Sequence, residues 1–330
     1  MKLAAVLVLI VILVAGCKET DDVDGRNIST SSGVSSCSGR TSGIAEGPVD
    51  LYLPYPSGNA YVVGQTWFGT FSHYTTGREH ALDFTMATNN DIWPVAPGRV
   101  MSVKEDSNIT CSSNCNDANH VVIDHGNGFI GKYLHFCQNC VDVALGAEIN
   151  SDTRIGGAGN TGWSTGTHLH FELVNIEDNC TVTYGFSNIN SGARTALAQG
   201  TTYSSLNAGT AFSSYTASKI NGSAYEIVGI TLTEGIDWYL SAGDTITVKG
   251  SLTSAAQAEG SNQVAVFLVD SDANAVVSSP TTLEYELNVT DSFNFTYTIP
   301  AVSAGKYNLG ISKSINGSYS WQNAPVIVIH

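Results

Sequence analysis

Short runs that alternate apolar and polar residues recur along most of this chain. Between residues 48 and 180 the clearest runs are 60–63, 81–84, 98–103, 120–124 and 129–135, with Gly and Asn between them. A period of two is typical of strands that bury one face, and no long stretch has the 3.6-residue period of a helix. The pattern predicts an all-β domain over residues 48–180.

The C-terminal third of the chain shows the same alternation. Its runs are 226–232, 245–250, 263–270, 283–289, 293–299, 306–312 and 325–329. Short strands at this spacing predict an immunoglobulin-like β-sandwich domain over residues 223–330, and the run that contains Tyr307 resembles the tyrosine-corner strand of such folds. Residues 181–222, rich in Ser, Thr, Asn and Ala, are predicted to be a connecting segment packed partly on the first domain.

The N-terminus has the features of a targeting segment. Lys2 precedes an apolar run, residues 3–15, that is too short to span a bilayer comfortably and matches the apolar part of a signal peptide. The run ends in Val14-Ala15-Gly16-Cys17, which resembles the bacterial lipobox, whose cysteine is lipidated and becomes the mature N-terminus. Residues 1–17 are therefore predicted to be a lipoprotein signal peptide. The alternative is an ordinary cleaved signal with an incidental cysteine.

The polar residues 18–47 are predicted to be a flexible tether, because they hold few large apolar side chains. If Cys17 is lipidated, Lys18 at the next position fits sorting to the outer membrane of a Gram-negative cell. We therefore expect an exported lipoprotein of the cell envelope, held at the membrane by a lipid anchor at Cys17.

Charge and cysteine content fit an exported protein. The 29 acidic and 14 basic residues give a net charge of −15, which opposes binding to nucleic acid. Besides Cys17, an even set of cysteines suits disulfides in an oxidising compartment. Spacing does not fix their pairing; we expect the bridges Cys111/Cys115, Cys137/Cys140 and Cys37/Cys180. For the first two pairs, the alternative is a four-thiolate zinc site.

The most informative motif is His168-Leu169-His170, which lies in a strand-like run that continues to Leu173. Side chains at positions i and i+2 of a strand share one face, so both imidazoles can reach one point. Imidazole is a common zinc ligand, and a catalytic zinc keeps one position open for water. Such pairs also occur on ordinary strands, so the metal hypothesis depends on partners elsewhere.

Two upstream blocks supply such partners. Residues 73–84 contain His73 and the run Ala81-Leu82-Asp83-Phe84, and residues 124–136 end in Tyr133-Leu134-His135-Phe136. With the block from Gly159 to Glu172, they resemble in this order the LytM/lysostaphin-type zinc metallopeptidases of peptidase family M23. The resemblance covers residues 48–173. It implies an all-β fold with a LytM-type antiparallel β-sheet peptidase domain, here followed by the predicted sandwich.

The resemblance implies a role for each of five residues. His73, Asp83 and His170 become the zinc ligands, and His135 and His168 become catalytic histidines that do not bind the metal. Two nitrogens and one carboxylate oxygen on Zn²⁺, with a fourth position for water, form a chemically sensible hydrolytic site. In the implied mechanism His168 is the general base, and His135 hydrogen-bonds the water or the developing oxyanion.

The first block departs from the usual family pattern, in which the first ligand lies four residues before the aspartate. Glu79 occupies that position here. His80 lies three residues before Asp83, so in an extended strand it would point to the opposite face. Some members place the ligand farther upstream, in a Ser-His arrangement that His73 and its preceding serine resemble. We therefore expect His73, with His80 and then Glu79 as alternatives.

Two other positions bear on the site. Thr167 stands where the family usually has proline, which should alter loop rigidity and leave the ligands in place. Glu172 shares strand parity with His168 and His170, so it either orients them or has a surface or packing role.

The resemblance implies a zinc endopeptidase that hydrolyses peptide cross-links of peptidoglycan. The alternative is a non-catalytic LytM-type envelope regulator that activates cell-wall amidases. Degenerate domains of that kind lose ligands, whereas this chain retains a complete set, which favours the enzyme. A third hypothesis is an adhesin that uses the sandwich. By analogy, the C-terminal domain has a protein or cell-wall partner.

Overall fold

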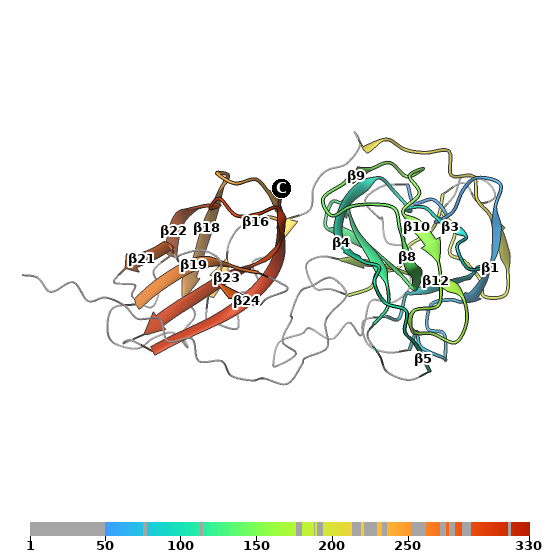
Figure 1. Cartoon of the computed structure of the whole chain (residues 1–330), viewed down its shortest axis with the longest axis horizontal. Helices are drawn as coiled ribbons and strands as arrows, with labels where there is room; N and C mark the ends of the chain where they lie inside the picture. The colour runs from blue at the N-terminus through green and yellow to red at the C-terminus, as the bar shows by residue number, and fades with distance from the viewer. Residues whose placement is uncertain are drawn as a thin grey trace, which may run out of the picture.

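The computed structural model describes residues 50–74, 78–112, 115, 117–175, 180–187, 189, 194–212, 219–220, 230–232, 236–252, 262–270, 275–276, 281–285, 292–315 and 318–330. The predicted signal peptide, Cys17 and the tether lie outside these residues. The described elements are strands, so the all-β expectation is confirmed (Figure 1). Within the same residues, no helix has the length and apolar character needed to cross a membrane.

An eight-stranded sheet forms the framework of the first domain. Each neighbouring pair of strands is antiparallel, as the M23 resemblance implied. The order across the sheet is β13 (Thr202–Ser204), β1 (Ala60–Gln65), β2 (Leu82–Thr85), β12 (His168–Asn175), β7 (Phe129–Leu134), β6 (His120–Gly126), β4 (Gly98–Lys104) and β9 (Glu148–Ile149). The three sequence blocks thus lie on adjacent central strands, β2, β12 and β7.

The two faces of strand β12 have different roles: one packs in the core and the other carries the candidate site residues. Leu169, Phe171 and Leu173 are fully buried in the hydrophobic core, and a side chain of this size stabilises the fold by roughly 1.5–3 kcal/mol when it leaves water. The alternate residues, His168 and His170 among them, point to the other face. Because a one-residue slip would exchange the two sets, the core fixes the register that positions the histidines.

Two smaller sheets accompany the main sheet. β10 (Gly156–Ala158) pairs with β3 (Asp91–Ile92) and β8 (Phe136–Val141), and β11 (Gly162–Trp163) pairs in parallel with β5 (Thr110–Cys111). Both local disulfides expected from the sequence are present, Cys111–Cys115 and Cys137–Cys140, so these four cysteines are not a thiolate zinc site. Cys180 is also disulfide-bonded. Its expected partner Cys37 lies outside the described residues, and that pairing stays a prediction.

The described residues of 180–187 and 194–212, most of them in the predicted connecting segment, pack on the first domain. Val182, Tyr184, Phe186, Leu197 and Tyr203 belong to its hydrophobic core. Strand β13, which contains Tyr203, extends the main sheet by pairing with β1. The bounds of the connecting segment itself stay a prediction.

The C-terminal part contains two further main sheets. One has the order β15 (Ile230–Leu232), β18 (Thr245–Leu252), β22 (Ser292–Thr298). The other has the order β17 (Tyr239–Leu240), β24 (Ser318–Ile329), β23 (Gly305–Ile315), β19 (Asn262–Asp270), β20 (Ala275–Val276), with β21 (Thr281–Tyr285) also on β19. A short pair joins β14 (Lys219–Ile220) to β16 (Ile236–Asp237). The hydroxyl of Tyr307 donates to the carbonyl of Ser303 at 2.7 Å, as in a tyrosine corner. The immunoglobulin-like assignment itself stays a prediction.

Candidate metal centre

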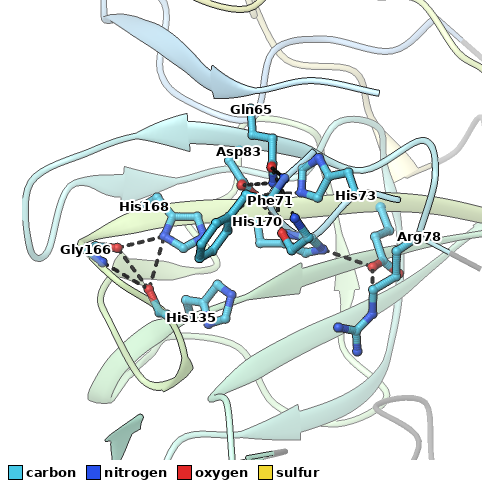
Figure 2. A network of polar contacts seen from close by, with 12 residues as sticks. Gln65, Phe71, His73, Arg78, Asp83, His135, Gly166, His168 and His170 are labelled. Atoms are coloured by element: carbon cyan, nitrogen blue, oxygen red, sulfur yellow. Dashed lines mark hydrogen bonds and ion pairs between the residues drawn. The ribbon is translucent and has the colours of Figure 1, made fainter. Parts of the chain in front are cut away.

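Strand pairing brings the candidate residues to one end of the main sheet. Asp83 in β2 lies directly opposite His170 in β12. His170 also lies opposite Leu134, the last residue of β7, which His135 follows. Because paired residues in neighbouring antiparallel strands present their side chains to the same face, these groups converge. Figure 2 shows His73, Asp83 and His170 together, with His135 and His168 beside them.

His73, Asp83 and His170 form a three-ligand cradle. Oδ1 of Asp83 lies 2.8 Å from Nδ1 of His170 and 3.3 Å from Nε2 of His73. One ligand atom from each residue lies within 4.8 Å of the others. One Zn²⁺ ion with bonds of about 2.0–2.2 Å can span such a group. The structure thus brings together the three residues that the family resemblance implied as ligands.

His73 comes from the loop between β1 and β2, and its ring is fully buried. Nδ1 lies 3.0 Å from the carbonyl oxygen of Thr66, which can only accept, so Nδ1 carries the proton. Nε2 then offers a lone pair toward Asp83, and it is buried with no hydrogen-bond partner. A buried polar atom without a partner is costly unless something binds it. A metal ion at this point would use that lone pair.

His170 lies between two carboxylates. Its Nε2 is 2.9 Å from Oε1 of Glu172, on the other edge of the ring from Asp83. Burial alone lowers the pKa of His170, but the hydrogen bonds to Asp83 and Glu172 outweigh it and raise the pKa to about 9. Burial raises the pKa of Glu172, but the bond to His170 lowers it to about 2. The site therefore favours positive charge, which a proton supplies when no metal is bound.

Asp83 is ionised in this setting. Burial raises its pKa, but the hydrogen bond from His170 and the positive charge of that ring hold the pKa well below its usual range. An ionised oxygen and two imidazole nitrogens are a donor set that suits zinc, whereas calcium and magnesium prefer oxygen donors throughout. The residues present therefore fit the ion that the family resemblance implies.

His135 and His168 face one another beside the cradle, with ring centroids 4.6 Å apart. Nδ1 of His135 donates to the carbonyl of Thr161 at 2.6 Å, and Nδ1 of His168 donates to the carbonyl of Gly166 at 2.7 Å. Burial lowers the pKa of His135 to about 3 and lowers the pKa of His168 as well. Both rings are therefore neutral near pH 7, with an unprotonated Nε2 available to accept a proton.

The backbone at His135 is in the left-handed region, with φ of 71°. Few residues other than glycine adopt this conformation, and it costs of order 1–3 kcal/mol. Here it lies at the junction between β7 and β8, where the chain turns away from the main sheet. The strain is thus located at a residue that the resemblance implies is catalytic.

The alternative first ligands lie elsewhere. Nδ1 of His80 is 3.1 Å from the carbonyl oxygen of Thr181, on a buried contact away from the cradle. Among the described residues, the groups able to hold a metal contain neither His80 nor Glu79. A second such group, His135 with His168 and His170, shares one residue with the cradle. The placement favours His73, and the ligand assignment stays a prediction.

Sequence reasoning missed Gln65, the last residue of β1. Its Nε2 donates to Oδ2 of Asp83 at 3.1 Å and to Oγ of Ser72 at 2.8 Å, and its Oε1 accepts from the backbone N–H of Phe71 at 3.1 Å. Gln65 thus ties the loop that carries His73 to Asp83. Alternation alone would place Gln65 on the same face as the core residue Val63. The register shifts between these two residues, however, and Gln65 is paired with Asp83 on the face of the site. The alternation in the sequence therefore carries no signal for this role.

Comparison with known proteins agrees with this geometry. Residues 77–182 match the model of peptidase family M23. The matched segment includes Asp83, His135, His168 and His170, whereas His73 lies just before it.

Curated relatives resemble limited parts of the chain. The chain is 46% identical over 56 residues to peptidoglycan DD-endopeptidase ShyA of Vibrio cholerae, which is 17% of this chain and 13% of that protein. It is 36% identical over 105 residues to peptidoglycan DD-endopeptidase ShyC of the same organism, which is 31% of this chain and 22% of that protein. The chain thus spans less than a quarter of the length of either relative.

Among solved structures, the catalytic domain of the prophage-encoded M23 protein EnpA from Enterococcus faecalis is similar at 22% identity and a TM-score of 0.31. That match covers 40% of this chain and 93% of the EnpA domain.

Proposed function

We propose that this chain, in which residues 77–182 are a peptidase family M23 region, is a zinc-dependent endopeptidase that hydrolyses peptide cross-links of peptidoglycan. The observation that carries the proposal is the cradle of His73, Asp83 and His170, with the unpartnered Nε2 of His73 aimed into it. Two neutral histidines beside the cradle complete the groups that amide hydrolysis needs.

His73, Asp83 and His170 would hold the zinc, which when bound lowers the pKa of a water molecule and polarises the scissile carbonyl. His168 takes the proton of that water at Nε2, because its Nδ1 already donates to Gly166. The resulting imidazolium can then pass the proton to the leaving amine, since neutral amines leave more readily than amide anions.

The hydrogen bonding of His135 defines its role more closely. Its Nδ1–H is committed to Thr161, so the neutral ring can only accept at Nε2. In the ground state it therefore accepts a hydrogen bond from the attacking water and helps to orient it. It can donate to the developing oxyanion only after it has taken up a proton.

The substrate part of the proposal rests on relatives. ShyA and ShyC are peptidoglycan DD-endopeptidases, and a location in the cell envelope agrees with the signal peptide and lipid anchor proposed at Cys17. We further propose that the lipid anchor places the peptidase domain within reach of the cell wall. The polar residues 18–47 would provide the reach.

Digestion of purified peptidoglycan tests the function. The full chain, purified with zinc, should convert cross-linked muropeptide dimers to monomers with intact glycan strands, as read by mass spectrometry. The variant His168→Ala should keep its zinc and lose this conversion. Glycan cleavage, or no product from the zinc-loaded protein, would contradict the proposal. If the protein released no product itself but stimulated an amidase, the regulator hypothesis would replace it.

A further inference from the structure

Trp238 links the C-terminal domain to the first domain. Its indole is 1% exposed, and Nε1 donates to Oδ2 of Asp124 at 2.8 Å. Asp124 is fully buried in β6 of the main sheet. Trp238 immediately precedes β17, whose residues pair in parallel with β24, so it is held by the sheet of the C-terminal domain. A buried carboxylate needs donors, and the other domain supplies one of them.

Tyr239 makes the second contact between the domains. Its ring lies 3.9 Å from the guanidinium carbon of Arg99 in β4, within cation–π range, and stacks on His330 with centroids 4.3 Å apart. A Cβ added to Gly146 would lie 2.7 Å from the Tyr239 ring, so the peptidase loop there fits closely against it. Arg99 is paired directly opposite Asp124. Two adjacent residues of one domain therefore contact two adjacent strands of the other.

Register shows where this contact lies relative to the metal centre. His170 is opposite Leu134, Leu134 is opposite His120, and Asp124 is four residues farther along the same strand as His120. Paired residues, and residues an even number apart on one strand, share a face. Asp124 and His170 therefore point to the same face of the sheet. They are about 13 Å apart along the strand direction at 3.3 Å per residue, and about 10 Å apart across the sheet, because β7 lies between their strands.

We infer that the C-terminal domain is docked in a fixed position on the catalytic face of the main sheet, with Trp238 as its anchor, and forms one side wall of the substrate cleft. Figure 1 shows β16 and the C-terminus on the side of this domain nearest to β4 and β9. The docking is independent of the proposed function. The role as a wall of the substrate cleft, in contrast, rests on the proposed function, because it requires a substrate bound at the metal centre.

Hydrogen exchange of the full chain, followed by mass spectrometry, tests the docking. In Trp238→Ala, amides in peptides covering 236–240 and 142–149 should exchange roughly tenfold faster, while β12 and β23 keep their protection. Trp238→Phe keeps an apolar ring without the N–H, and should give a smaller change. Thr298→Ala, at an exposed position of β22, is the control and should change neither peptide.

Arg99→Ala removes the partner of Tyr239 on the first domain. This variant tests the same contact if Trp238→Ala fails to fold. It should accelerate exchange in 236–240 without affecting β23. Unchanged exchange at 236–240 in the folded Trp238 and Arg99 variants would overturn the docking.

Activity on two substrates of different size tests whether the C-terminal domain forms a wall of the substrate cleft. Relative to wild type, Trp238→Ala should lose more activity on intact peptidoglycan than on a short cross-linked peptide that does not reach the wall. Equal effects on both substrates, with docking lost, would overturn the wall role. If the wild type cleaves neither substrate, the proposed function fails while the exchange data still decide the docking.

Discussion

The carboxylate of Glu172 lies 2.9 Å from Nε2 of His170, two residues away on the same face of β12. The opposite ring nitrogen faces Asp83. A metal-bound histidine commonly donates its second N–H to a carboxylate, which fixes the tautomer and the orientation of the ring. Glu172 is buried, and Arg78 lies 3.7 Å away and offsets part of its charge. The pair has the arrangement expected of a zinc ligand and its orienting group.

Glu172→Ala should therefore weaken zinc binding by about 10–100-fold, measured by competition with a chromogenic chelator. Glu172→Gln keeps an oxygen that accepts from His170 and should lose less affinity. Asp106→Asn removes a carboxylate that is 81% exposed and remote from the cradle, so it serves as the control. Equal zinc affinity in the wild type and Glu172→Ala would show that Glu172 does not orient His170 for metal binding.

His73→Ala should abolish zinc binding, whereas His80→Ala should retain it. His73 faces Asp83, and His80 bonds to Thr181. Losing that buried bond should instead lower the free energy of unfolding by about 1–3 kcal/mol, measured by urea denaturation. Metal loss in His80→Ala, with a native stability, would reverse the ligand assignment.

Zinc binding should release a proton. The pKa of His170 is raised to about 9 in the metal-free site, so the ring is protonated at pH 7.5 and must lose that proton to bind a metal. Calorimetry in buffers of different ionisation enthalpy should show about one proton released per zinc, falling toward zero as the pH passes 9. Binding heats that are independent of the buffer at pH 7.5 would contradict this.

The same shift affects the stability of the metal-free protein. The folded pKa of His170 lies above its ordinary value of 6.5. Its stabilising contribution should therefore be fully present below pH 6.5 and disappear as the pH rises through 9. Thermal denaturation of the chelator-treated protein measures this trend, and His170→Gln should remove it.

Gln65→Leu should loosen the loop of residues 66–74. The substitution nearly preserves side-chain volume but removes the bonds to Asp83, Ser72 and the Phe71 amide. We expect faster hydrogen exchange in this loop and a severalfold loss of zinc affinity, since His73 lies on the same loop. Gln138→Leu, at an exposed position, is the matched control. A loop that exchanges as in the wild type would exclude a clamping role for Gln65.

Local structure can be predicted well from this sequence, whereas contacts between residues far apart along the chain cannot. The two-residue period of 168–173 predicts which side chains of β12 share a face, and the structure confirms the strand. That Asp83 and His170 meet could be predicted only from the resemblance of the three sequence blocks, in their order, to peptidase family M23. No period or spacing connects Trp238 to Asp124, because their contact depends on the packing of two domains. Alternation does not predict the role of Gln65, because an irregularity of β1 between Val63 and Gln65 places Gln65 opposite Asp83 rather than on the core face.

Zinc content tests the central claim most directly. The full chain, purified without added metal chelator and measured by elemental mass spectrometry, should contain one zinc per molecule. His170→Ala should contain none while it keeps a folded far-ultraviolet spectrum. Wild-type protein that holds no zinc as purified, and takes up none when zinc is added, would contradict the account and favour a non-catalytic role.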